Sequence, residues 1–185
     1  MNKNIRLLLA ASICIHMGLN ILAPVYAIYV QRIDGGLIYA STSLGFYAIL
    51  RGILYFLFAR IKDARISHKP ILFIGYMMYA VGYLGYIFIN APMQLFIVLS
   101  WIAVADSLLN PAWSAVLASS LQTGKERETY SKFYGYRSIF EGIGALMGGV
   151  AIVTFGFTWT FVLMAGFASC AAILTLLLNN KQIEV

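Results

Sequence analysis

The sequence predicts an all-α protein that crosses a membrane several times. Hydrophobic residues make up 61% of its 185 residues and charged residues only 11%, whereas soluble domains contain about 25% charged residues. The mean hydropathy is +0.82. The apolar residues are also gathered into long runs separated by short polar segments, and about 20 consecutive apolar residues are enough for a helix to span a bilayer. Together these observations predict a polytopic integral membrane protein.

Six apolar runs are long enough to be transmembrane helices, and together they form one predicted domain over residues 1–185. The first run follows the basic residues Lys3 and Arg6. It could instead be a signal peptide that ends at Ala27, but His16 and Asn20 interrupt its core and five more apolar runs follow it. We therefore assign it to a helix. The six predicted helices cover about residues 7–30, 37–59, 71–89, 93–118, 133–154 and 158–178.

Polar segments separate these helices. Turns are predicted at Gly36 after the first helix, at Pro92 before the fourth and at Gly156 before the sixth, because Gly and Pro favour turns. The two longer segments, 60–70 and 122–132, are rich in charged residues and are predicted to be loops.

The basic residues predict the orientation of the helices, because Lys and Arg near helix ends stay on the cytoplasmic side. With both termini in the cytoplasm, the outer turns contain only Arg32. The inner segments then contain ten basic residues: Lys3, Arg6, Arg60, Lys62, Arg65, Lys69, Lys125, Arg127, Lys132 and Lys181. We therefore expect both termini to be cytoplasmic.

Three helices that start inside, followed by three that start outside, give the arrangement of a 3+3 inverted repeat. Two features of the sequence support it. When residues 45–53 are aligned with residues 135–143, both Gly and both Ile are identical, and Arg51 lies opposite Glu141. Pro24 in the first helix also has a counterpart in Pro111 of the fourth.

Five ionisable residues lie within the predicted helices: His16, Arg51, Asp106, Arg137 and Glu141. A charged side chain at a helix centre costs roughly 2.5 to 3.5 kcal/mol in a bilayer and usually faces the protein interior. Counted from the helix ends, these residues lie near the middle of the bilayer, with Arg137 nearer the inner side. Arg51 with Asp106, and Arg137 with Glu141, could be structural ion pairs. The alternative is a substrate or proton site, and all five residues are candidates for a solute cavity.

Polar and aromatic residues extend this candidate cavity. Asn20 lies four residues after His16, while Asn110 and Trp113 follow Asp106, so each group shares one face of its helix. We expect a polar wall with an aromatic platform. A lone His is also often a hydrogen-bonded packing residue, and both interpretations stay open for His16.

Tyrosines form a stripe on the third predicted helix, at Tyr76, Tyr79, Tyr83 and Tyr86. They could stack on a ligand. Aromatic residues at helical spacing are more often packed against other helices, and we expect such packing or an interfacial belt here.

The fifth predicted helix carries a stripe of small residues, namely Ser138, Gly142, Ala145 and Gly149. Small side chains let two helix backbones approach closely in a bilayer. We expect this stripe to be a helix-packing surface and the contact surface of a dimer.

No residue pattern indicates an enzyme, a metal site or a cofactor. His16 and His68 are too few for a metal cluster, and no nucleophile has a base at helical spacing. Cys14 and Cys170 fall within apolar runs, so we expect packing residues rather than a disulfide. The net charge of +6 is spread over short loops, which argues against nucleic-acid binding.

Several segments occur in an order that is typical of one family. Residues 59–70 contain Asp63 and Arg65 in a loop similar to Gly-x-x-x-Asp-Arg-x-Gly-Arg-Lys. Further along come Asn110-Pro-Ala-Trp-Ser-Ala, Lys125-Glu-Arg-Glu, Phe133-Tyr-Gly-Tyr-Arg-Ser-Ile and Gly142-x-Gly144-x-x-x-Gly148-Gly149. In these features the chain resembles the major facilitator superfamily. The resemblance covers the whole chain but only one six-helix half of a family member.

The resemblance implies a secondary transporter of a small solute. Because one half cannot enclose a solute, we expect two half-length units to form a homodimer that works by alternating access. A non-transporting membrane module, or an accessory half that pairs with a different protein, is the alternative. The resemblance also implies that Asp63, together with Arg65, belongs to a cytoplasmic gate and faces the start of the fifth helix of the other unit. The expected location is a prokaryotic plasma membrane.

Overall fold

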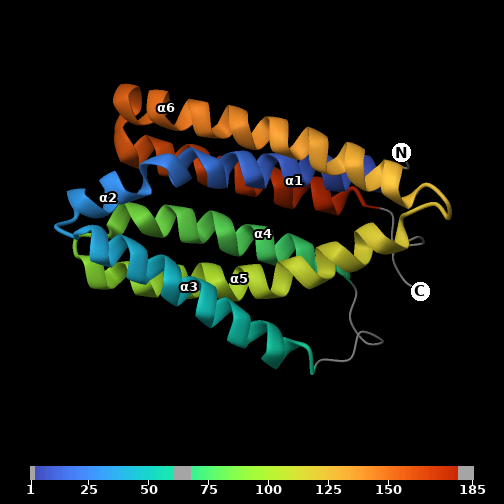
Figure 1. Cartoon of the computed structure of the whole chain (residues 1–185), viewed down its shortest axis with the longest axis horizontal. Coiled ribbons are helices and arrows are strands. Elements are labelled where there is room, and N and C mark those ends of the chain that lie inside the picture. The colour runs from blue at the N-terminus through green and yellow to red at the C-terminus, as the bar shows by residue number, and fades with distance from the viewer. Residues whose placement is uncertain (1–2, 61–67, 179–185) are drawn as a thin grey trace.

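The computed structural model describes residues 3–60 and 68–178, and over these ranges the chain forms helices joined by short turns (Figure 1). The elements are α1 (Lys3–Leu22), the short η1 (Ala23–Val25), α2 (Tyr26–Arg32), α3 (Leu37–Phe58), α4 (His68–Gly85), the short η3 (Tyr86–Phe88), α5 (Pro92–Ser119) and α6 (Glu126–Leu176). No strand occurs in the described ranges. The prediction of an all-α fold is confirmed.

Five helical segments are long and apolar enough to cross a membrane: Lys3–Arg32, Leu37–Phe58, His68–Phe88, Pro92–Ser119 and Glu126–Leu176. The first four correspond to the first four predicted helices. The first combines α1, η1 and α2, because Pro24 in η1 has no N–H to donate and the helix tightens there without ending.

The fifth segment, α6, contains two limbs. A straight helix of its 51 residues would be about 77 Å long at 1.5 Å per residue, far more than a bilayer requires. At Gly156 the backbone leaves the helical region, with φ at 74° and ψ at 175°, a conformation that favours glycine. Figure 1 shows α6 folding back on itself near this position. The limbs 126–155 and 157–176 match the fifth and sixth predicted helices in position.

The first limb of α6 begins earlier than the sequence predicts. It starts at Glu126 rather than near Phe133, so the part of segment 122–132 from Glu126 onward is helix and not loop. Glu126 and Glu128 lie in the first turn, where negative charges interact favourably with the exposed N–H groups and the helix dipole. The charged composition therefore marks a helix start here.

Helix α1 is held between the two limbs of α6. A Cβ atom added to Gly144 would lie 2.6 Å from the Met17 carbonyl oxygen, and one added to Gly148 would collide with the Ile21 carbonyl. These glycines of the first limb thus allow backbone contact with α1. On the other side, Gly18 of α1 faces Met164 of the second limb.

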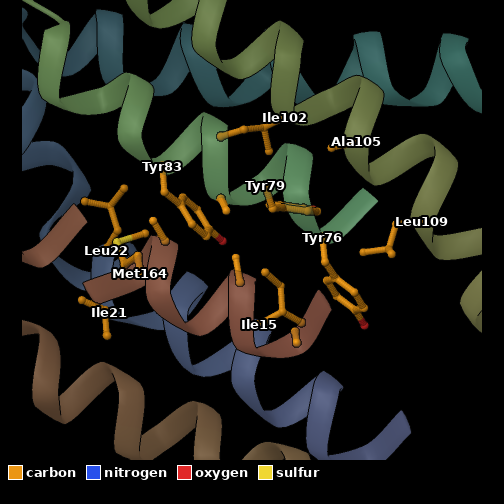
Figure 2. Packing of buried hydrophobic residues seen from close by; sticks show 14 of the residues in the cluster. Ile15, Ile21, Leu22, Tyr76, Tyr79, Tyr83, Ile102, Ala105, Leu109 and Met164 are labelled. Carbon is orange, nitrogen blue, oxygen red and sulfur yellow. The ribbon is translucent and has the colours of Figure 1, made fainter. Parts of the chain in front are cut away.

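The predicted tyrosine stripe lies in the core, on α4 and η3, with Tyr79 facing α5. Figure 2 shows Tyr76 and Tyr83 directed from α4 toward the helices that carry Ile15 and Met164. All four tyrosines of the stripe are buried. The expectation that they pack against other helices is confirmed.

Helix α3 is the least buried of the long helices. It packs mainly against α5 and also contacts α2, and it diverges from its neighbours toward its C-terminal end (Figure 1). Ala40 and Ser43 are its only buried residues, while Ile49 and Phe56 are 68% and 80% exposed. Apolar packing therefore contributes little to its attachment.

Candidate functional site

Asp106 on α5 is the centre of a network that joins three helices. Its Oδ2 accepts hydrogen bonds from the Tyr47 hydroxyl and from Arg51 Nη1, both at 2.8 Å. Its Oδ1 accepts from the Tyr79 hydroxyl at 2.7 Å and from Asn110 Nδ2 at 2.5 Å. We call these five residues the Asp106 cluster. The predicted pairing of Arg51 with Asp106 is present.

The carboxylate of Asp106 is enclosed and fully occupied. Only 8% of its side chain is exposed, against 37% for Arg51, and both oxygens accept two hydrogen bonds. The guanidinium of Arg51 also lies over the Tyr47 ring, 5.0 Å from its centroid. Burying a carboxylate is costly unless it is paired and hydrogen-bonded, and here one cation and three further donors satisfy it. The cluster is therefore suited to holding helices together.

The side chains that attach α3 recur at every fourth residue: Ser43, Tyr47, Arg51 and Tyr55. Ser43 shares a hydrogen bond of 2.7 Å with the Tyr26 hydroxyl on α2, and the Tyr55 hydroxyl accepts one of 2.9 Å from Asn110 on α5. We call these four residues the α3 polar stripe. Hydrogen bonds between helices contribute about 0.6 to 2 kcal/mol each in a bilayer, where the hydrophobic effect does not drive helix association.

A second group of charges joins α1 to the first limb of α6. Glu141 Oε1 accepts a hydrogen bond from Arg137 Nε at 2.8 Å and lies 3.3 Å from His16 Nδ1. Glu141 Oε2 has no hydrogen-bond partner among the described residues. We call His16, Arg137 and Glu141 the Glu141 cluster. Their side chains are 28%, 25% and 26% exposed, so this cluster is more open than Asp106.

The structure divides the predicted cavity residues into these two clusters, and within the described ranges no hydrogen bond or ion pair joins one cluster to the other. Two candidates belong to neither cluster. Asn20 donates to the backbone oxygen of His16 at 2.8 Å, which is a bond within its own helix. Trp113 packs edge-on against Phe133 of α6, with ring centroids 5.3 Å apart.

The structure describes the residues predicted for a dimer contact but not those predicted for a cytoplasmic gate. Asp63 and Arg65 lie outside the described residues. In the small-residue stripe, Ser138, Gly142 and Gly149 are exposed and Ala145 is half-buried, so this face of α6 is left open while Gly144 and Gly148 contact α1.

Sequence reasoning missed Tyr47, Tyr55 and Tyr79 as partners of the charged residues. The spacing of four between Tyr47, Arg51 and Tyr55 was available as a signal, because such residues share one helix face. No group of three or more His, Cys, Asp or Glu that could hold a metal occurs in the part of the chain that the structure describes. Cys14 and Cys170 are free thiols.

The fold and these two clusters define a class of protein: a helical membrane domain with paired opposite charges in its interior. The family model of the Major Facilitator Superfamily matches residues 8–184. The chain therefore belongs to the Major Facilitator Superfamily. The superfamily comprises transport proteins and not enzymes, in agreement with the expectation from the sequence.

The chain is similar to bacterial proteins that carry the name Multidrug resistance protein MdtG. It is 25% identical over 163 residues to the protein of Klebsiella pneumoniae (strain 342), an alignment that covers 86% of this chain and 39% of the relative. The protein of Salmonella newport (strain SL254) is 25% identical over 171 residues, which cover 89% of this chain and 42% of the relative. The chain thus spans about two-fifths of the length of the curated relatives it matches.

Proposed function

We propose that the chain is a six-helix unit of a secondary transporter that moves a small amphipathic solute across the bilayer. The Glu141 cluster carries the proposal, because its carboxylate, guanidinium and imidazole stay about one quarter exposed within membrane-spanning helices. Ionisable groups in such positions mark substrate or ion pathways in many membrane proteins. Membership of the superfamily supports the same activity.

The two clusters take different parts in the proposed transport. Glu141 Oε2 has no partner among the described residues and can accept a hydrogen bond from a solute, while His16 and Arg137 both contact Oε1. The Asp106 carboxylate has no such capacity, because four donors already occupy it. The Glu141 cluster therefore contacts the solute, and the Asp106 cluster positions α3. The name of the relatives, multidrug resistance protein, supports an amphipathic organic solute.

The proposed working form contains two six-helix units that alternate between access to the two sides of the membrane. Homodimerisation, or pairing with a different six-helix half, would supply the second unit. Support comes from the open glycine faces of α3 and α6, since a Cβ added at Gly45, Gly142 or Gly149 would meet nothing within 4 Å. Glycine faces allow close approach of another helix in a bilayer.

A non-transporting module that binds a different membrane protein is the second candidate. The observation in its favour is the large exposed apolar face of α3, which includes Ile49 and Phe56. Such a face suits a permanent protein contact as well as a lipid contact.

Reconstitution into proteoliposomes, with ethidium as the transported probe, tests the proposal. Glu141→Gln should lower the uptake rate by about tenfold or more, equivalent to about 1.4 kcal/mol, because the charge that faces the solute is lost. Glu128→Gln is the matched control, since Glu128 forms an exposed pair with Lys132 four residues along the same helix. Uptake no faster than in protein-free liposomes would favour the non-transporting module.

A further inference from the structure

A cavity of about 420 Å³ lies where the end of α3 meets the start of α4 and the C-terminal half of α5. Pockets for small molecules typically have volumes of about 300 to 1,000 Å³. No member of the Asp106 or Glu141 clusters lines it. The lining includes Tyr55 and Phe58 from α3, His68 from α4, and Ser107, Pro111 and Ala115 from α5.

The residues that line the cavity determine whether a charged or a neutral molecule can bind there. Most of the lining side chains are apolar, among them Phe58, Ile71 and Leu108. His68 is the only described lining residue that can carry a charge near neutral pH. Because an unpaired charge is costly in apolar surroundings, the cavity favours a neutral molecule.

Two polar side chains at the cavity have unused hydrogen-bonding capacity. The Tyr55 oxygen accepts from Asn110 Nδ2 at 2.9 Å, and the Tyr55 hydroxyl hydrogen has no acceptor among the described residues. His68 Nδ1 is buried, and no described residue forms a hydrogen bond with it. Unpaired polar atoms cost about 1 to 3 kcal/mol each when buried, so a guest that pairs with them is stabilised.

Proline in α5 removes a backbone donor beside the cavity. Pro111 lies inside the helix and has no N–H, so the carbonyl oxygen of Ser107, four residues earlier, loses its helical donor. Ser107 and Pro111 both line the cavity. Because Ser107 is 0% exposed, its carbonyl oxygen is closed to a bound molecule. The Tyr55 hydroxyl is left as the donor at this cavity.

We propose that this cavity binds a small neutral amphiphile through a hydroxyl group. The hydroxyl oxygen accepts a hydrogen bond from Tyr55, while the apolar part of the molecule lies against Phe58 and Ala115. The site is separate from the residues proposed for transport. It is nevertheless connected to α3 attachment, because Ser107 Oγ lies 3.4 Å from the Arg51 carbonyl oxygen.

Photolabelling of the full chain in lipid nanodiscs with a diazirine-bearing octanol tests the site. Mass spectrometry should place the label on lining residues of α3, α4 and α5, and 1-octanol should compete. Ala115→Phe fills the cavity and should lower this labelling about tenfold. Ala118→Phe is the matched control, because Ala118 is exposed on the same helix and does not line the cavity.

Two further measurements test the hydroxyl contacts. Tyr55→Phe should weaken competition by 1-octanol about two- to tenfold, the usual effect of one hydrogen bond. Octane has no oxygen to accept a hydrogen bond and should compete several-fold less well than 1-octanol with the unsubstituted protein. Equal competition by 1-octanol and octane would overturn the proposal. So would labelling spread over all lipid-facing helices and unaffected by 1-octanol.

Discussion

The Asp106 carboxylate differs from that of Glu141 in how its oxygens are used. Tyr47, Arg51, Tyr79 and Asn110 surround Asp106 from three helices, whereas Glu141 keeps one oxygen without a partner among the described residues. Removing one member of an enclosed ion pair leaves the other charge unpaired in a low-dielectric interior. At the residue scale, the Asp106 cluster should therefore control stability more than the Glu141 cluster does.

Arg51 and Asp106 should be energetically coupled. Arg51→Gln and Asp106→Asn should each destabilise the protein by about 3 kcal/mol, because each leaves one charge uncompensated. The double substitution should cost clearly less than the sum of the two. Thermal unfolding of the four proteins in detergent measures the coupling, and strictly additive effects would contradict the pairing.

At the scale of helices, α3 and α1 are attached by opposite means. Helix α3 is attached by side-chain hydrogen bonds from the α3 polar stripe, with only Ala40 and Ser43 buried. Helix α1 is attached by backbone contact, which Gly144 and Gly148 permit. Loss of a hydroxyl group should therefore weaken the attachment of α3, whereas an added methyl group at a contact glycine should weaken the attachment of α1.

The α3 polar stripe can be tested by removing one hydroxyl group. Tyr47→Phe keeps the ring but leaves the Asp106 carboxylate with one donor fewer, at a cost of about 1 kcal/mol. Faster hydrogen exchange of the α3 backbone would report weaker attachment. Tyr39→Phe, also on α3, is the control. The Tyr39 side chain is exposed, so this substitution removes no comparable contact. The same exchange rate in both variants would show that the stripe does not hold α3.

The contact between α6 and α1 can be tested at two neighbouring glycines. Gly148→Ala would place a methyl group against the Ile21 carbonyl and should destabilise the protein by about 1 to 3 kcal/mol. Gly149→Ala meets nothing within 4 Å, so it should be neutral or stabilise the helix by up to about 1 kcal/mol. Thermal unfolding in detergent should rank Gly149→Ala as the more stable of the two. The reverse order would mean that α6 is rotated about its axis relative to the described packing.

At the scale of the whole molecule, the open surfaces lie on α3 and the first limb of α6. Gly45 and Gly142 both face open space, and these glycines belong to the matching segments 45–53 and 135–143. The inverted repeat, the orientation of the termini and the dimer remain predictions. A second six-helix unit on these surfaces would cover them both.

Association through α6 can be tested with Gly142→Leu. Because Gly142 is exposed and has no neighbour within 4 Å, Leu should leave the folding of one unit intact and hold an opposing backbone away. Cross-linking in native membranes should then show at least a several-fold loss of dimer. Ile139→Leu on the same limb is the control, since it changes an exposed residue without adding bulk. Unchanged cross-linking in Gly142→Leu would exclude this face as the dimer contact.

Much of the fold could be predicted from the sequence, because a chain in lipid must satisfy its backbone hydrogen bonds within helices. The pairing of Arg51 with Asp106 followed from opposite charge at equal depth. The packing of Gly144 and Gly148, rather than Gly142 and Gly149, against α1 could not be predicted, since both pairs have helical spacing and only the rotation of α6 decides between them. The tyrosine partners of Asp106 could not be singled out, because the sequence contains 12 tyrosines.

The Arg51–Asp106 pair also bears on how the chain is made. Arg51 lies on α3, and its partner lies on α5, which leaves the ribosome later. When α3 first meets the bilayer, its arginine has no carboxylate from α5 beside it, and an unpaired arginine at a helix centre resists insertion by about 2.5 kcal/mol or more. The ion pair that offsets this cost can therefore form only after the third span and half of the fourth have been synthesised.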